Sequence, residues 1–278
     1  MKRRDKMLKP TEFIDAYAQT GAAKCSSSAK RLLLLALLSG FILGTAGAAA
    51  STASFAFENV AAAKLINAFI FAFGLIVIIY TGAELFTGNC LIAISLLEKR
   101  VTALSMLRNL VIVYLGNFAG CALVAWCCVV TERFDLAGGA LAVSTIRTAV
   151  AKCSLSFSDA FILGIFCNAL VCLGVVCGVT AKSAAGKAVG AYLPVCIFVI
   201  CGFEHSIANM YYIPAGLFAN ALPVYGEAAA KAGVDTAALT WANFAVNNLL
   251  PVTLGNIVGG AGLGALLWGA NHAGKETK

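Results

Sequence analysis

Four long stretches of the chain carry no charged side chain, and they limit the fold more than any other feature of the sequence. They cover residues 32–57, 109–131, 160–181 and 236–274, and the shortest has 22 residues. A helix needs about 20 apolar residues to cross the hydrocarbon core of a membrane. Only 12% of the residues are charged and 60% are hydrophobic, which is too little charge to cover a soluble domain. The sequence therefore predicts an all-α polytopic membrane protein.

Two further apolar stretches each contain one polar interruption. Residues 64–97 are interrupted at Glu84, and residues 188–220 at Glu204 and His205. Counting both as spans gives six transmembrane helices, of which helices 2 and 5 are broken. Residues 1–31 carry Glu12 and Asp15 and are followed by no cleavage signal. We therefore expect them to stay in the chain as an N-terminal segment.

The distribution of Lys and Arg predicts the orientation. With six spans both termini lie on one side, and 15 of the 20 basic residues belong to segments on that side. Because short basic loops stay in the cytoplasm, we expect both termini to be cytoplasmic, in a bacterial inner membrane. The net charge of +7 then reflects topology. No basic stretch has the interleaved aromatic residues typical of nucleic-acid binding.

An internal repeat divides the chain. The letters FILG occur at residues 41–44 and again 120 positions later, and the same offset takes Gly82 and Glu84 to Gly202 and Glu204. The pattern LGNxxG recurs at 115–120 and 254–259. Each copy holds three spans, so the second copy must lie inverted in the membrane. We expect one domain over 1–278, with an N-terminal segment (1–31), a first repeat (32–152) and an inverted second repeat (153–274), and with a transport path at the midplane.

The two interruptions carry the candidate functional residues. A break frees backbone groups that are costly in hydrocarbon, and Glu84 and Glu204 have a bracing role there as acceptors for freed N–H groups. Proton transfer is the alternative for both carboxylates. Thr87 either caps the second half of helix 2 or faces the path. His205 is the only histidine of the membrane region, and a titratable group at that depth marks a functional site.

Small residues and thiols have structural interpretations. Four G-x-x-x-G patterns allow close helix packing. The eleven cysteines include no C-x-x-C motif and lie mostly in or beside apolar spans. We therefore read them as packing residues and expect no metal site.

Several of these stretches resemble the formate/nitrite transporter family. IYTGAELFTG (79–88) and GFEHSIANM (202–210) resemble the two loop motifs of that family, GIFCNALVCLG (164–174) its fourth span, and NNLLPVTLGNIVGG (247–260) its last span. Ala169 and Gly174 depart from the residues usual there. The resemblance covers nearly the whole chain. It implies a homopentamer of aquaporin-like protomers, each with its own pore and no cofactor.

The resemblance also implies roles for individual residues and for the N-terminal segment, in which residues 11–22 look like a cytoplasmic surface helix. An interfacial amphipathic anchor is the alternative for that helix. The implied roles are proton exchange in the pore for His205 and Thr87, the cytoplasmic constriction for Leu85 and Phe86, the periplasmic constriction for Phe71, Leu75 and Phe198, and polar positions of the substrate path for Asn168, Asn248 and Lys152.

We therefore expect passage of small monovalent anions of weak acids, with proton exchange at His205. Formate is the first candidate, because Pro214 and the ELFTG letters resemble formate-type members; nitrite and hydrosulfide are alternatives. A neutral-solute aquaporin-like channel is the alternative of another class, although the N-P-A pair is missing. An ammonium channel usually needs a second pore histidine. An intramembrane enzyme would need a catalytic partner near His205, so no enzymatic activity is expected.

Overall fold

A computed structural model describes residues 7–273 of the chain, without the side chains of Pro10 and Thr11. All six predicted spans are present as helices long and apolar enough to cross a membrane, and the all-α fold is confirmed. The spans are α2 (Ala29–Ser54), α3 with α4 (Val60–Phe71, Phe73–Thr81), α7 (Ala103–Val130), α9 (Phe157–Thr180), α10 (Ala184–Cys201) and the last span, made of α13 (Trp241–Asn243), the π-helical η3 (Phe244–Leu249) and α14 (Leu250–His272). Of the basic residues that predicted the orientation, Lys2, Arg3, Arg4, Lys6, Lys275 and Lys278 lie outside the described residues.

The second and fifth spans are broken, as predicted. After α4 the chain leaves the helix and resumes as α5 (Phe86–Asn89), η1 (Cys90–Ile92) and α6 (Ala93–Leu97). After α10 it resumes as α11 (Ser206–Asn220). Both breaks fall inside otherwise apolar spans, so their backbone groups need partners supplied by the protein.

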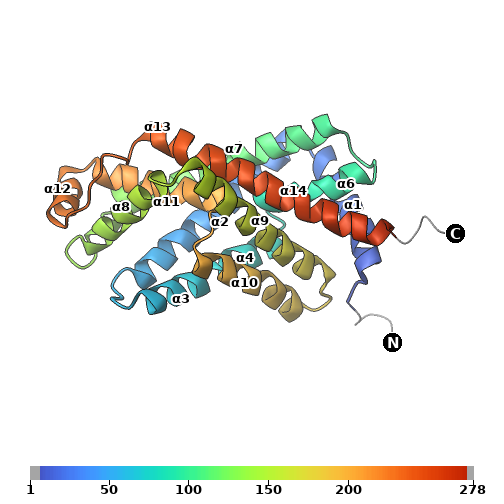
Figure 1. Cartoon of the computed structure of the whole chain (residues 1–278), viewed down its shortest axis with the longest axis horizontal. Helices are drawn as coiled ribbons and strands as arrows, with labels where there is room; N and C mark the ends of the chain where they lie inside the picture. The colour runs from blue at the N-terminus through green and yellow to red at the C-terminus, as the bar shows by residue number, and fades with distance from the viewer. Residues whose placement is uncertain (1–6, 274–278) are drawn as a thin grey trace.

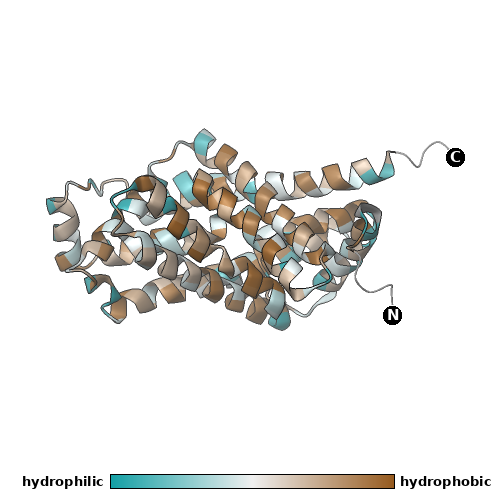
Figure 2. Cartoon of the chain, turned by 90° about the horizontal axis from the view of Figure 1, so that it is seen from below, coloured by the Kyte–Doolittle hydropathy of each residue, from teal (hydrophilic) through white to brown (hydrophobic). Residues whose placement is uncertain are grey.

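Helices outside the spans mark the two ends of the molecule. α1 (Pro10–Ser26) was expected, whereas α8 (Ala140–Cys153), α12 (Pro223–Lys231) and the short η2 (Arg133–Asp135) were not. α8 and α12 lie at one end and α1 at the other (Figure 1). In Figure 2 hydrophobic residues predominate along the helices, and hydrophilic residues gather mainly near loops and helix ends.

The N-terminal helix α1 packs against the protein. Phe13, Ile14 and Tyr17 are each 2% exposed. They form a cluster with Leu91 and Ile94 of the second half of span 2, and side chains of α9 and α14 pack on it. The apolar face of α1 is thus occupied by protein and is not available as a membrane anchor.

The repeats pack in equivalent ways. α2 lies along α7 and α9 lies along α14, so the first span of each repeat packs on the third. Gly40 of α2 faces the backbone of Asn117, and Gly255 of α14 faces the backbone of Phe161. A Cβ at either glycine would collide with a carbonyl group, which explains small residues at these positions.

Candidate functional site

The first break ends α4 at a glycine in the left-handed conformation. Gly82 has φ +66°, which a side chain would disfavour. Two residues later the N–H of Glu84 donates to the carbonyl of Leu35 on α2 (3.2 Å). Leu85 then takes an extended conformation (φ −111°, ψ 123°) as the N-cap of α5.

The second break repeats this path. Gly202 has φ +71°, and the N–H of Glu204 donates to the carbonyl of Leu163 on α9 (3.3 Å). The N-cap of α11 is His205, again extended (φ −109°, ψ 113°). His205 therefore occupies in the second repeat the backbone position that Leu85 occupies in the first.

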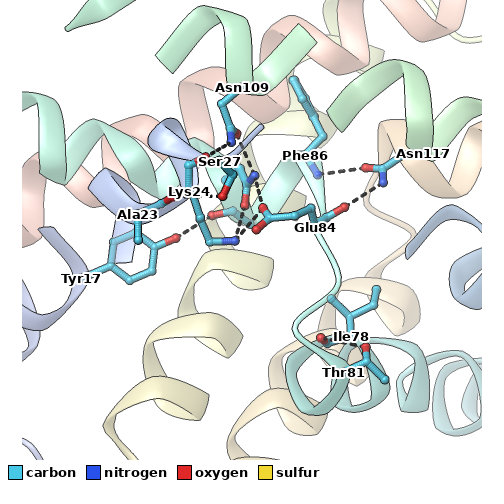
Figure 3. Close-up of polar contacts among 12 residues, drawn as sticks. Tyr17, Ala23, Lys24, Ser27, Ile78, Thr81, Glu84, Phe86, Asn109 and Asn117 are labelled. Carbon is cyan, nitrogen blue, oxygen red and sulfur yellow. Dashed lines mark hydrogen bonds and ion pairs between the residues drawn. The ribbon is translucent and has the colours of Figure 1, made fainter. Parts of the chain in front are cut away.

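A buried asparagine braces the first break from α7. The Nδ2 of Asn117 donates to the carbonyls of Ala36 (2.8 Å) and Glu84 (2.9 Å), and its Oδ1 accepts from the N–H of Phe86 (2.9 Å). Figure 3 shows Asn117 beside the break, with one dashed line to Phe86 and one to Glu84. One amide thus satisfies three backbone groups of the break and its neighbour helix.

Asn256 on α14 braces the second break in the same way. Its Nδ2 donates to the carbonyls of Gly164 (2.8 Å) and Glu204 (3.0 Å), and its Oδ1 accepts from the N–H of Ser206 (2.9 Å). Sequence reasoning missed both asparagines as functional residues. The sequence did contain a signal for them, because they are the asparagines of the repeated LGNxxG pattern.

A cluster of polar side chains around the buried Glu84 lies beside the first break (Figure 3). Glu84 accepts from the Nζ of Lys24 on α1 (2.8 Å) and from the Nδ2 of Asn89 (2.7 Å). Asn89 also donates to Asn109, whose Nδ2 donates in turn to the Lys24 carbonyl. The carboxylate is therefore held by one cation and one amide, and α1 is tied to the break.

The second break has the matching cluster. Glu204 accepts from the Nζ of Lys152 on α8 (2.8 Å) and from the Nδ2 of Asn209 (2.6 Å). Asn209 also donates to Asn248, whose Nδ2 donates to the Lys152 carbonyl. The π-helical turn of span 6 carries Asn248 into this cluster.

The clusters differ from the bracing we expected of the two carboxylates. Glu84 and Glu204 bind side chains, and the freed backbone N–H groups find carbonyl and asparagine acceptors instead. Both Lys152 and Asn248 were expected at polar positions of the path. Lys152 lines a hollow together with Glu204 and His205, whereas Asn248 is not among the residues that line it and binds Asn209 and the Lys152 carbonyl instead. Lys24 was not predicted, because nothing local in the sequence links residue 24 to residue 84.

His205 connects the two breaks. Its Nε2 lies 3.0 Å from the Oγ1 of Thr87, and its Nδ1 accepts from the backbone N–H of Ala208 (3.0 Å). The ring stacks on Phe198, with centroids 5.7 Å apart and an interplanar angle of 13°. Thr87 does not cap α5, whose N-cap is Leu85. Both Thr87 and His205 are buried.

A cavity of about 10 Å³ lies against the His205 ring. This is roughly the space that one water molecule occupies. Every other side chain around the cavity is apolar: Leu43, Phe71, Leu75, Leu85, Val171, Val195 and Phe198. The structure therefore brings the histidine together with Leu85 and all three residues expected at the periplasmic constriction.

Two expected constriction residues are placed differently. Leu75 also lines a larger hollow on the α1 side, described below as the α1-side vestibule, so it lies between that vestibule and the cavity. Phe86 lines neither the cavity nor that vestibule. Its ring packs edge-on against Tyr114 of α7, with centroids 4.9 Å apart, because it follows Leu85 at the start of a helix and points to another side.

Two vestibules flank the cavity. The α8-side vestibule has about 190 Å³ and includes Lys152, Glu204, His205, Phe71 and Phe198 in its wall. The α1-side vestibule has about 330 Å³ and includes Lys24, Glu84, Leu75 and Leu85. Each vestibule thus holds one of the Lys–Glu pairs and reaches the apolar residues around the cavity.

Asn168 of α9 lies behind the first break. Its Nδ2 donates to the carbonyls of Thr87 (3.1 Å) and Asn256 (2.6 Å). The side chain therefore positions the turn that carries Thr87, and Asn168 borders neither vestibule nor the cavity.

Residues 7–273 contain no group of three His, Cys, Asp or Glu side chains that could hold a metal ion. The eleven cysteines are all free. Most are buried among helices, in agreement with a packing role.

Comparison with known proteins identifies the family. The sequence profile described as "Formate/nitrite transporter" matches residues 11–269. The chain is 33% identical over 261 residues to the formate channel FocA of Escherichia coli K12, covering 91% of this chain and 90% of that protein. It is 37% identical over 203 residues to FocA of Haemophilus influenzae, covering 71% and 70%.

A solved structure agrees with the sequence relatives. A pentameric formate channel with formate bound superimposes with a TM-score of 0.79 at 32% identity, covering 88% of this chain and 98% of the other. The fold, the two broken spans and these matches together show that the chain belongs to the formate/nitrite transporter family.

Proposed function

We propose that this protein is a channel for small monovalent anions of weak acids, formate first, which exchange a proton at His205 as they pass. The observation that carries the proposal is the single imidazole beside an apolar cavity between two vestibules, each with a lysine. A naked anion pays a large desolvation cost in an apolar passage. A proton shared at the narrowest point reduces that cost.

Lys152 and Lys24 raise the local concentration of anions at the two mouths. The Lys152 ammonium donates to Glu204 and keeps two of its three hydrogens for an anion, whereas the Lys24 ammonium donates to Glu84 and Asn89 and keeps one. The small cavity favours formate, nitrite and hydrosulfide over longer carboxylates. Formate is placed first because the relatives at 33% and 37% identity are named formate channels.

The setting of the channel follows from the same relationships. We place the α1 side in the cytoplasm, because the basic residues of the sequence concentrate there. We further propose a homopentamer, by analogy with the pentameric formate channel of similar fold. Each protomer then carries its own path.

Purified protein in liposomes tests the substrate. Uptake of formate, nitrite, hydrosulfide and glycerol is compared in one preparation, with protein-free liposomes as the control. We expect formate, and the other small anions to a lesser degree, to enter faster than through the lipid alone. Glycerol entry without formate entry would identify a neutral-solute channel and refute the proposal.

A further inference from the structure

A hollow on the α1 side of the molecule has a positively charged wall. It has a volume of about 370 Å³ and lies beside the loop that joins α6 to α7. Lys99 and Arg100 of that loop line it, together with the hydroxyl residues Thr102 and Ser105. The opposite wall belongs to the C-terminal part of α1, and no acidic side chain of residues 7–273 lines the hollow. We call it the basic hollow, and its wall suits an anion.

The protein supplies no carboxylate partner for the two loop cations. The ion pairs within residues 7–273 have Lys24, Lys152 and His272 as their basic partners. Lys99 and Arg100 are exposed and are not among them. Both side chains are therefore available to an anion from outside the protein.

The neighbouring charged groups are bound elsewhere. Glu98 precedes the two cations in the sequence, and its Oε1 accepts from the Nε1 of Trp268 (2.8 Å) and lies 3.2 Å from the Nε2 of His272. This carboxylate is thus held by α14. Arg108 donates to two carbonyls at the end of α1, so its guanidinium fastens α1 to α7. The positive charge of the loop therefore stays unbalanced.

Lys99 stands at a backbone position where glycine is usual. Its φ is +56°. The N–H of Lys99 donates to the carbonyl of Leu96 (3.0 Å), and the N–H of Arg100 donates to the carbonyl of Ser95 (2.8 Å). This pair of bonds is the common way for a helix to end, with glycine preferred at the position that Lys99 occupies. A side chain is disfavoured there, which indicates that the ammonium has a use that glycine would not provide.

The basic hollow lies where the membrane-spanning segments end. α6 ends at Leu97 and α7 begins at Ala103. Leu104 is 76% exposed and Leu107 is 56% exposed, so the first turns of α7 already present apolar side chains to the hydrocarbon. Cations directly beyond such a boundary lie at the depth of the lipid headgroups. This position favours a lipid phosphate over a soluble anion or an acidic protein.

We propose that the basic hollow binds the phosphate headgroup of an anionic phospholipid from the leaflet on the α1 side. Lys99 and Arg100 bind the phosphate oxygens, as basic pockets at the ends of membrane helices do. The hydroxyl of Thr102 accepts from the N–H of Ser105 (3.2 Å) and keeps its own hydrogen for the phosphate. Because α1 forms the opposite wall, the bound lipid also fastens α1 to the loop. The proposal does not depend on which anion passes through the channel.

Lipid titration of the purified protein in one detergent tests the site. Native mass spectrometry counts the bound lipids, with phosphatidylglycerol as the anionic probe and phosphatidylcholine as the neutral one. Each basic residue near a membrane surface contributes about fivefold to the binding of an anionic lipid. We therefore expect the double variant Lys99→Gln with Arg100→Gln to raise the dissociation constant of phosphatidylglycerol about 25-fold and to leave phosphatidylcholine binding unchanged.

A matched double variant separates a site from net charge. Lys182→Gln with Lys187→Gln removes the same charge where α9 is joined to α10, on the same side of the membrane by the predicted topology, and neither lysine lines the basic hollow. We expect parent-like binding of phosphatidylglycerol in this variant. An equal loss of affinity in the two double variants would overturn the proposal, because net charge alone would then explain the binding.

Lys99→Gly guards against a loss of affinity that comes from misfolding. Glycine suits a φ of +56°, so we expect thermal stability in the absence of added lipid to equal or exceed that of the parent. The dissociation constant of phosphatidylglycerol is nevertheless expected to rise about fivefold. Parent-like affinity in Lys99→Gly would refute the role of the Lys99 ammonium.

Competition identifies the source of the anionic group. Inorganic phosphate and a polyglutamate peptide are each added to the complex with phosphatidylglycerol, at the concentration of the lipid. We expect neither to release it. Release by inorganic phosphate would show a site for soluble phosphate, and release by polyglutamate would show a surface for an acidic protein. Either result would overturn the assignment to lipid.

Discussion

Lys152→Met tests whether Glu204 is an ionised carboxylate that its ion pair with Lys152 holds in place. The substitution keeps an apolar stem and removes the ammonium that lies 2.8 Å from Glu204. The glutamate side chain is only 7% exposed, so it is left as a buried charge without its cation. Removing one partner of a buried ion pair costs about 3–5 kcal/mol. We expect a decrease of that size in the free energy of unfolding.

The double variant Lys152→Met with Glu204→Gln supplies the control. A glutamine oxygen still accepts from Asn209, and no unpaired charge remains. We therefore expect the double variant to recover most of the lost stability, measured by denaturant unfolding in one detergent. Lys24→Met is the matched variant of the other half, because the Lys24–Glu84 pair has the same length and similar burial.

Two outcomes would refute this reasoning. If Lys152→Met were as stable as the parent, the ion pair would not hold the carboxylate in place. If the double variant were no more stable than Lys152→Met, the loss would come from something other than an unpaired charge. Acid-driven formate uptake that persists in the double variant at a reduced rate would show in addition that Glu204 holds its neighbouring side chains in place and does not transfer the proton.

Two further predictions concern packing and the lumen. Gly255→Ala places a methyl group against the Phe161 carbonyl and is expected to lower the unfolding free energy by about 1–3 kcal/mol. Gly262→Ala on the same helix is the control, because a methyl group there contacts no other atom. Equal stability of the two variants would contradict the close packing at Gly255. Leu85→Ala is expected to enlarge the cavity and raise acetate uptake relative to formate, while Phe86→Leu, outside the cavity, is expected to leave the ratio unchanged. A larger change of the ratio in Phe86→Leu would contradict the placement of both side chains.

Most of the fold could be predicted from the sequence, because membrane crossing imposes a simple composition rule. The charge-free stretches identified the spans, and the isolated Glu84 and Glu204 identified the breaks. α8 and α12 were missed, because short helices outside the membrane have neither the length nor the continuous apolar run that marks a span.

The site was less predictable, because its parts meet only in three dimensions. The Lys24–Glu84 pair joins residues 60 positions apart. The orientation of Phe86 depends on where α5 begins, and the π-helical turn at Asn248 leaves no local signal. The internal repeat also relates the asparagines of the two clusters, which the sequence analysis did not identify. Asn89 and Asn209 share the offset of 120, and Asn109 and Asn248 share the offset of 139.

Acid-driven formate uptake by liposomes containing His205→Phe tests the proton-exchange role most directly. The variant keeps an aromatic ring of similar size that can stack on Phe198, and it removes both ring nitrogens. His272→Gln, which changes the other histidine, is the control. We predict that uptake by His205→Phe no longer responds to an imposed pH gradient, whereas the control responds like the parent protein. An unchanged response in His205→Phe would show that the proton is exchanged elsewhere.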